Sequence, residues 1–164
     1  MSKWPLLPIL FLGMLLGFFS GPATAVEQHE EVLCLAENIY FEARSESTAG
    51  RIAVALVTLN RVEHPNFPDT VCGVVKQTKY YPSGRIDLHS CQFSWYCDGK
   101  SDTPTESCWD EIVLLADIML GWEATDFTQG ALWYHSKKVN PDWASHYVQT
   151  VSVDNHIFYK PLDK

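Results

Sequence analysis

Apolar residues recur at helical spacing in the first part of the chain. They predict an amphipathic helix from about residue 30 to 44, with Val32, Leu35, Ala36, Ile39 and Ala43 on one face. At about 100° per residue, Glu42 lies beside Leu35 at the edge of this apolar face. Glu37 lies on the opposite side, so we expect its carboxylate to be solvated.

A second helix is predicted from about residue 48 to 62, with Ser47 as its N-cap. The run 52–57 is apolar on every side, so this helix should be central and buried. Pro65 and Pro68 then indicate a loop, and a short helix should follow over 70–76.

The second half of the chain predicts one more long helix and small β elements. Residues 77–101 indicate loop plus a β-hairpin, with the alternating segment 92–95 as its strand. A capping box at 103–106 should open a helix that ends near Leu120, before Gly121. Segments 131–135 and 156–159 should be short strands. The fold class is therefore α+β, mostly helical, with a buried central helix and a small β-hairpin or sheet.

The N-terminus resembles a targeting segment. Lys3 precedes an almost wholly apolar run, 6–19, and 21–25 ends in an A-x-A pattern typical of signal-peptide cleavage. We expect residues 1–25 to be a signal peptide and residues 26–164 to form one exported domain, in the periplasm or outside the cell. The alternative is an uncleaved anchor, for which the apolar run is short, because a spanning helix takes about 20 residues.

Charge and cysteine content narrow the class of function. The formal net charge of −8 argues against nucleic-acid binding, which depends on basic residues that neutralise phosphates. Five cysteines in an exported chain suggest disulfides, and the odd number leaves at least one thiol unpaired or paired between chains. Cys91 and Cys97 could close a loop, but the sequence does not fix the pairing. An exporting context works against a catalytic thiol.

Glu42 is the strongest candidate for catalysis. It follows Tyr40 and Phe41 near a helix end, and a carboxylic acid in apolar surroundings can keep its proton at neutral pH and donate it. Glu46 is either a helix-terminal anion or a second functional carboxylate. The ordinary alternative for each residue is a surface glutamate.

Two groups combine aromatic rings with hydrogen-bonding side chains, as sugar-binding sites do. One comprises Gln92, Ser94 and Trp95; the other comprises Trp133, Tyr134, Asn140 and Trp143. Either group could instead be ordinary half-buried structure, since a Trp is most often a packing residue. The six histidines form no close ligand pair, and we expect no metal and no cofactor.

The residues around Glu42 resemble the E-A-R-G-E signature of the SleB/CwlJ-type cell wall hydrolases, the spore cortex-lytic enzymes and their relatives. Similar blocks recur in order along nearly all of the chain after the targeting segment, at 34–46, 50–55, 59–62, 64–68, 71–75, 91–95, 131–135, 139–141 and 156–159. One departure is Ser45, which occupies the place usually held by Gly. It would carry strain if that backbone had a positive φ.

The resemblance implies a lysozyme-like catalytic domain over 26–164 that cleaves peptidoglycan glycan strands, with Glu42 as the catalytic acid. We expect a lytic transglycosylase acting between N-acetylmuramic acid and N-acetylglucosamine. Substrate binding is assigned to Gln92, Ser94, Trp95, Tyr134, Asn140 and Glu46, and Arg44 should brace the helix end by a salt bridge. The alternatives are a hydrolytic muramidase, an amidase or endopeptidase, and a non-catalytic wall-binding protein. We expect a monomer, without stable membrane insertion after cleavage.

Overall fold

The computed structural model describes residues 24–121 and 125–162. Two long helices open the fold, α1 (Ala25–Ala43) and α2 (Thr48–Glu63). Helix α1 begins five residues earlier than predicted because Thr24 and Glu27 form a capping box, in which Thr24 N donates to Glu27 Oε2 at 2.7 Å. The predicted signal peptide, 1–25, lies almost wholly outside the described residues, and cleavage after Ala25 would remove this cap.

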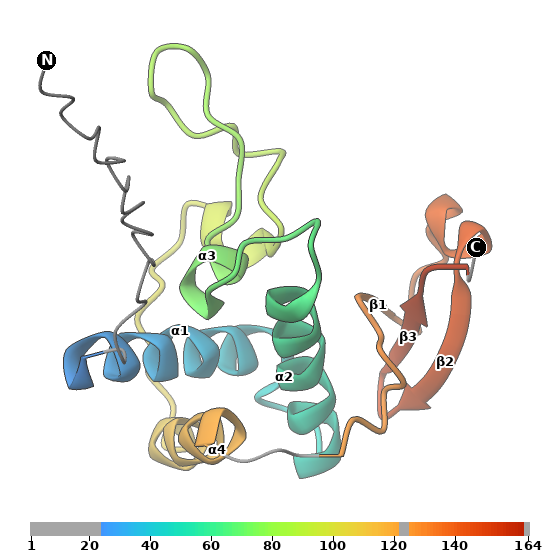
Figure 1. Ribbon diagram of the computed structural model, residues 1–164, viewed down its shortest axis with the longest axis horizontal. Coiled ribbons are helices and arrows are strands. Elements are labelled where there is room, and N and C mark those ends of the chain that lie inside the picture. The colour runs from blue at the N-terminus through green and yellow to red at the C-terminus, as the bar shows by residue number, and fades with distance from the viewer. Residues whose placement is uncertain (1–23, 122–124, 163–164) are drawn as a thin grey trace, which may run out of the picture.

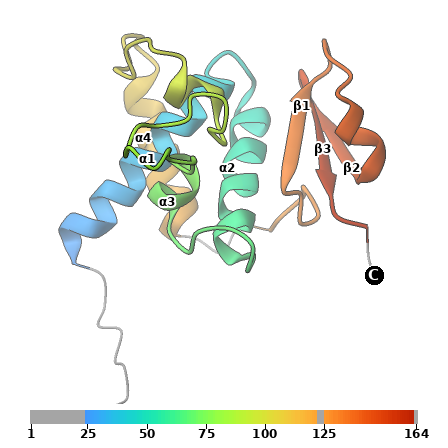
Figure 2. The ribbon, with the colours of Figure 1, turned by 90° about the horizontal axis from the view of Figure 1, so that it is seen from above.

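Helix α2 is the central element, as the sequence predicts. Figure 2 shows it between the sheet on one side and α1, α3 (Val71–Val75) and α4 (Trp109–Gly121) on the other. Ser47 caps α2 through a 3.3 Å bond from Gly50 N to its hydroxyl, again as predicted. None of the helices in the described ranges is both long and apolar enough to cross a membrane.

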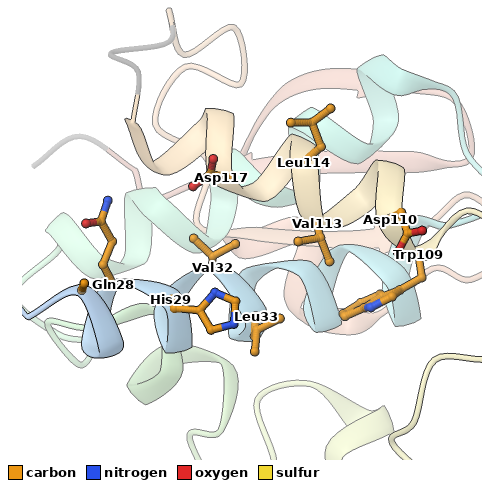
Figure 3. Close-up of a pocket in the computed structure, with 10 residues that line it drawn as sticks. Gln28, His29, Val32, Leu33, Trp109, Asp110, Val113, Leu114 and Asp117 are labelled. Carbon is orange, nitrogen blue, oxygen red and sulfur yellow. The ribbon is translucent and has the colours of Figure 1, made fainter.

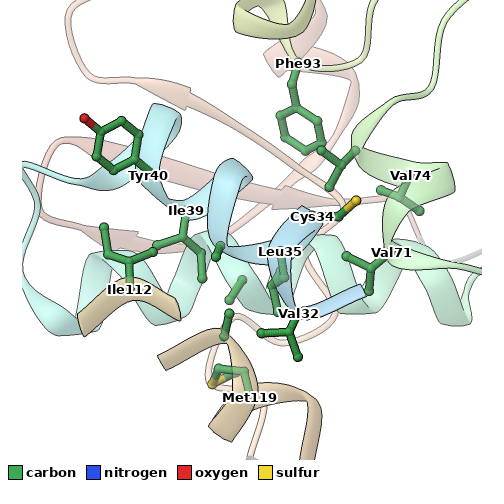
Figure 4. Close-up of a cluster of buried hydrophobic side chains, with 14 of the residues drawn as sticks. Val32, Cys34, Leu35, Ile39, Tyr40, Val71, Val74, Phe93, Ile112 and Met119 are labelled. Atoms are coloured by element: carbon green, nitrogen blue, oxygen red, sulfur yellow. The ribbon is translucent and has the colours of Figure 1, made fainter. Parts of the chain in front are cut away.

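The main core lies where α1 meets α3 and α4 (Figure 4). The buried face of α1 presents Leu35 and Ile39 toward Ile112 and Met119 of α4, as the helical spacing indicates. On its other side, a disulfide between Cys34 and Cys72 joins α1 to α3, with an S–S distance of 2.03 Å. Burial of these side chains fixes the direction of α1, and therefore the position of Glu42 near its C-terminal end.

The sheet is small and antiparallel, with strand order β1-β3-β2. Its strands are β1 (Trp133–Ser136), β2 (Val148–Val153) and β3 (His156–Lys160), and a 3₁₀ turn, η2 (Asp142–His146), precedes β2 (Figure 1). The sequence missed β2. Its pairing with β3 is irregular between Gln149 and Ser152, which breaks the alternation that identifies a strand.

A close contact attaches the sheet to the start of α2. The β2–β3 turn carries Asp154, whose Oδ2 accepts hydrogen bonds from Ser47 N at 2.9 Å and Ser47 Oγ at 2.5 Å. A Cβ built on Gly50 would lie 2.5 Å from the same Asp154 oxygen, so this position needs glycine. The contact fixes the sheet relative to α2 and, with it, the side chains of β1.

Three sequence predictions are wrong. Residues 92–95 form no strand; the chain turns into a 3₁₀ helix, η1 (Ser94–Cys97), because a Cys91–Cys97 disulfide closes this short loop and buries Phe93 and Trp95. The described part of 77–101 contains a single isolated bridge, between Tyr80 and Ile86.

The capping box predicted at 103–106 does not open a helix, and α4 starts at Trp109. The backbone N–H groups of Thr105 and Glu106 instead donate to Tyr40 Oη, at 3.1 and 3.2 Å. The Glu106 carboxylate accepts from Arg44 Nε at 2.7 Å, which confirms the predicted brace at the end of α1. The backbone N–H and the carboxylate of Glu106, which the capping box would have used, are therefore bonded to Tyr40 and Arg44 instead.

The third error concerns Glu37, which is half-buried rather than fully solvated. Burial raises the pKa of its carboxyl group, and the nearby Lys76 partly offsets this. Ser45 does not have a positive φ, since Gln129 and Asp154 are the only non-glycine residues with one in the described ranges. The departure from glycine at Ser45 therefore carries no strain of that kind.

Candidate active site

Glu42 lies in the last turn of α1, one residue before its end. The two residues before it on α1 are aromatic, Tyr40 and Phe41, as the sequence analysis noted. Tyr134 of β1 donates a hydrogen bond from its hydroxyl to Glu42 Oε2 at 3.1 Å. Burial raises the pKa of Glu42, while the Tyr134 hydrogen bond and the positive charge of Arg61 lower it. The larger effect is burial, so the carboxyl group holds its proton to higher pH than an exposed glutamate.

A cavity of about 310 Å³ opens at this carboxyl group. Its walls come from the end of α1, from α2, from the segment around η1, from β1 and from η2. The lining residues are Glu42, Arg61, Cys91, Gln92, Phe93, Ser94, Trp133, Tyr134 and Trp143. Apolar rings with a few convergent polar groups are typical of a ligand site.

The cavity brings together several residues that the sequence selected. Glu42, Gln92, Ser94 and Tyr134 all line it, although they are widely separated along the chain. The Cys91–Cys97 disulfide holds the segment that carries Gln92 and Ser94. The backbone N–H of Gln92 also donates to Gln77 O at 2.9 Å, which fixes the start of this segment.

Two tryptophans, Trp133 and Trp143, belong to the aromatic part of the cavity wall. Trp133 of β1 packs against Tyr147 with ring centroids 4.2 Å apart, and Trp143 of η2 packs on the same tyrosine at 5.9 Å. Trp143 also contacts Tyr159 of β3 at 5.5 Å. These contacts hold both indole rings beside the cavity, where they could lie against a flat ligand.

Trp95 is a correction to the predicted site. It does not line the cavity; it is buried in the core, where its ring stacks on Phe41 at 4.6 Å. Its indole N–H donates to Asn38 Oδ1 at 3.2 Å, and Asn38 Nδ2 in turn donates to Thr58 Oγ1 at 3.0 Å. The ring and its donor are both used internally, so Trp95 supports α1 rather than contacting a ligand.

Glu46 and Asn140 also lie apart from the cavity lining. The Glu46 carboxylate accepts hydrogen bonds from Asn155 N at 3.2 Å and Asn155 Nδ2 at 3.0 Å, which ties the α1–α2 loop to the β2–β3 turn. Asn140 is exposed in the loop before η2. We therefore leave both residues out of the site.

Arg61 is the site residue that sequence reasoning missed. Its side chain is only 3% exposed, and Nε donates to Leu132 O at 2.8 Å. The guanidinium carbon lies 5.4 Å from the centre of the Phe67 ring and 5.1 Å from that of Phe93. Burial lowers the pKa of Arg61 to about 10, so it stays charged at neutral pH. In the sequence Arg61 stands between the apolar run 52–57 and the end of α2, beside the polar residues Asn60 and Glu63, so its position alone does not single it out.

A larger cavity, of about 640 Å³, lies between the first half of α1 and α4 (Figure 3). Val32, Leu33 and Val113 are among its apolar residues, and His29 and Asp117 are among its polar ones. It shares no residue with the Glu42 cavity. It has no buried carboxyl group comparable to Glu42, so size alone does not make it the better candidate.

The groups that alternative chemistries require are not assembled in the described residues. They bring together no set of three or more His, Cys, Asp or Glu side chains that could hold a metal ion. Four of the five cysteines form disulfides, which leaves Cys108 as the free thiol. The prediction of at least one unpaired cysteine is thus confirmed, and Cys108 does not line the Glu42 cavity.

Known proteins resemble this chain in both sequence and structure. It is 31% identical over 138 residues to a spore cortex-lytic enzyme of Bacillus cereus, covering 79% of this chain and 44% of that protein. A spore cortex-lytic enzyme of Bacillus subtilis is 30% identical over 135 residues, covering 79% and 37%. The chain therefore spans less than half the length of these two relatives.

Two solved structures share the fold. One is the catalytic domain of the germination-specific lytic transglycosylase SleB from Bacillus anthracis, with a TM-score of 0.60 and 28% identity, covering 85% of this chain and 99% of that one. The other is the catalytic domain of Bacillus cereus SleB, with a TM-score of 0.58, 28% identity and coverage of 85% and 94%. These matches confirm the predicted α+β, lysozyme-like fold class.

A family model provides the classification. The model described as Cell Wall Hydrolase matches residues 45–159, which contain α2, the η1 segment and all of the sheet except Lys160 at the end of β3. The match begins three residues after Glu42, so the assignment of Glu42 depends on the cavity geometry. With most of its length covered by the model, the chain belongs to the Cell Wall Hydrolase family.

Proposed function

We propose that this protein is a lytic transglycosylase that cleaves the glycan strands of peptidoglycan between N-acetylmuramic acid and N-acetylglucosamine. The observation that carries the proposal is a single half-buried carboxyl group, Glu42, in a cavity walled in part by Trp133 and Trp143. The printed names of its relatives, spore cortex-lytic enzymes and a lytic transglycosylase, agree with this activity.

The proposed reaction needs one carboxyl group in two roles. Protonated Glu42 donates its proton to the glycosidic oxygen, the bond from that oxygen to the muramic ring carbon breaks, and positive charge develops on the ring. The carboxylate then takes the proton of the muramic 6-hydroxyl, whose oxygen bonds to the same carbon and closes an anhydro ring. The proton given in the first step is recovered in the second, so no water is consumed.

The cavity favours this route over hydrolysis. A hydrolytic glycosidase normally uses two carboxyl groups about 5 to 9.5 Å apart. Among the described residues that line the cavity, Glu42 is the only carboxyl group. The other carboxylates that the sequence suggested as partners, Glu46, Asp87, Asp98 and Asp142, are absent from its lining. Gln92, Ser94 and Tyr134 are proposed to position the sugar.

We also propose that the protein is exported and acts at the cell wall as a monomer. Two disulfides, Cys34–Cys72 and Cys91–Cys97, suit an oxidising compartment. The apolar N-terminal run provides the independent argument from sequence.

The test is a digest of purified peptidoglycan with product analysis by mass spectrometry. A transglycosylase releases muropeptides that end in anhydro-muramic acid, lighter by one water than the products of hydrolysis. Reducing-end muropeptides would instead identify a hydrolytic muramidase. Release of free stem peptides with intact glycan would identify an amidase or endopeptidase and contradict the proposal.

A further inference from the structure

Arg61 lines the cavity, and of its guanidinium donors only Nε–H has a hydrogen-bond partner among the described residues. Its Nη1 atom is buried and has no partner among the described residues, whereas Nε is bonded to Leu132 O. Arg61 forms no ion pair with Glu42 in the described structure, although both residues line the same cavity. A charged guanidinium group that lines a cavity with most of its donors unpaired offers hydrogen bonds to an acceptor on a ligand.

The chemistry of the guanidinium group restricts which ligand acceptor fits. A guanidinium group only donates, so it is best matched by an oxygen that only accepts. Sugar hydroxyls carry a proton of their own, whereas the carbonyl oxygen of an N-acetyl group does not. Phe93, which also lines the cavity, lies 5.1 Å from the guanidinium carbon and offers an apolar surface to the acetyl methyl group.

We propose that the guanidinium group of Arg61 donates to the carbonyl oxygen of an N-acetyl group on the sugar bound beside Glu42, with Phe93 contacting the methyl group. This inference rests on the proposed function, because it takes an N-acetylated glycan as substrate. Arg61 is rigidly held for this role by the bond to Leu132 O and by the rings of Phe67 and Phe93. It makes the site selective for N-acetylated over de-N-acetylated glycan.

The experiment compares two substrates, peptidoglycan and the same material after chemical de-N-acetylation. Wild-type protein should cleave the N-acetylated form faster, because deacetylation replaces the acceptor by an ammonium group beside a guanidinium group. Arg61→Gln should lower the rate on N-acetylated substrate by about 10- to 100-fold, the effect of losing a charge-assisted hydrogen bond. It should change the rate on de-N-acetylated substrate much less, so the preference between substrates collapses.

Arg51→Gln is the matched control. Arg51 also lies on α2 and also has a buried nitrogen without a partner, Nε, but it is not part of the cavity lining. This variant should keep the wild-type preference for N-acetylated substrate. If Arg61→Gln fails to fold by circular dichroism, Arg61→Lys replaces it, since it keeps the charge but loses the fixed geometry and should retain only part of the preference.

A binding measurement separates this inference from the proposed activity. In a Glu42→Gln background, titration with N-acetylglucosamine oligomers and with glucosamine oligomers should show a preference for the N-acetylated form, which adding Arg61→Gln abolishes. Equal loss of rate on both substrates, or an unchanged binding preference, would overturn the role of Arg61. Full activity of Glu42→Gln would instead overturn the proposed function.

Discussion

The hydroxyl of Tyr134 donates a 3.1 Å hydrogen bond to Glu42 Oε2 and so joins the end of α1 to the first strand of the sheet. The bond orients the carboxyl group within the cavity and stabilises its ionised form, against the larger effect of burial. Burial and the neighbouring carboxylate also raise the pKa of Tyr134 well above its usual range, so this hydroxyl stays protonated and acts as a donor.

Tyr134→Phe should therefore move the pH dependence of the reaction. Loss of the hydrogen bond raises the pKa of Glu42 further, so the alkaline limb of the rate profile should shift to higher pH. The maximal rate should fall by about tenfold, because a lost hydrogen bond costs about 1 kcal/mol and the carboxyl group is less well oriented.

The rate–pH profile from pH 4 to 9 measures this effect. Tyr159→Phe is a suitable control, because the Tyr159 hydroxyl lies on the same sheet but bonds to His135 Nε2 at 3.0 Å. It should leave the alkaline limb in place. An unshifted profile for Tyr134→Phe would show that this bond does not tune Glu42.

The buried carboxyl group should also make stability depend on pH. Because the pKa of Glu42 is raised in the folded state, its contribution to stability is complete below the pKa of the unfolded chain, about 4.3, and is lost as pH rises through the folded value. Because glutamine does not ionise, Glu42→Gln should not lose this stability as the pH rises. Its Tm should match that of wild type near pH 4 and exceed it at pH 8.

Thermal unfolding of both proteins at the two pH values checks the sign. Tyr134 keeps a hydrogen-bond partner in Glu42→Gln, so the variant does not leave that hydroxyl unpaired. If Glu42→Gln is less stable than wild type at pH 8, the pKa of Glu42 is not raised in the folded protein.

Substitutions of Trp95 and Trp143 should have different effects, because Trp95 packs in the core and Trp143 lines the cavity. Trp95→Phe keeps the stacking on Phe41 but removes the N–H that Asn38 Oδ1 accepts. It should lower the free energy of unfolding by about 1–3 kcal/mol and leave KM unchanged. Trp143→Ala, on the cavity wall, should instead raise KM. Urea denaturation measures the free energy of unfolding, and initial rates measure KM. A raised KM for Trp95→Phe without loss of stability would show that Trp95 contacts the substrate.

The two disulfides should have different effects on the protein. Replacing Cys34 and Cys72 by Ser opens the link between α1 and α3, and should lower the free energy of unfolding by about 4 kcal/mol on the loop-entropy model. Replacing Cys91 and Cys97 opens a much shorter loop, with a cost of about 2 kcal/mol, but releases the segment that bears Gln92 and Ser94.

Activity at 20 °C, measured beside Tm, distinguishes these cases. The Cys91/Cys97 double variant should show the larger loss of activity and the smaller fall in Tm. The Cys34/Cys72 double variant should show the smaller loss of activity and the larger fall in Tm. Equal activity of the Cys91/Cys97 variant and wild type would show that the disulfide does not shape the site.

The sequence predicts the fold where a single physical effect dominates. The apolar repeat over α1 and the run 52–57 of α2 determine which helix faces are buried, so both helices and the edge position of Glu42 could be predicted. Prediction from the sequence fails where residues far apart in the chain compete for the same hydrogen-bonding groups. Glu106 was expected to cap a helix, but Arg44 and the Tyr40 hydroxyl bind it instead.

The same distinction holds for the candidate site. Gln92, Ser94 and Tyr134 were predicted from their chemistry, and the fold brings them to the cavity. Trp95 has the same chemistry, and only the tertiary position of Asn38 and Phe41 places it in the core. Arg61 could not be selected because its significance comes from an unpaired buried donor, which exists only in the folded protein.

The most direct test of Glu42 as the catalytic acid compares Glu42→Gln with Glu37→Gln on purified peptidoglycan. Both glutamates lie on α1, and burial raises the pKa of each, but only Glu42 lines the cavity. Glu42→Gln should lose at least about 1,000-fold in the rate of anhydro-muropeptide release, within the range for removal of a catalytic acid, while remaining folded. Glu37→Gln should keep nearly the wild-type rate. Equal rates for the two variants would contradict the assignment of Glu42 as the catalytic acid.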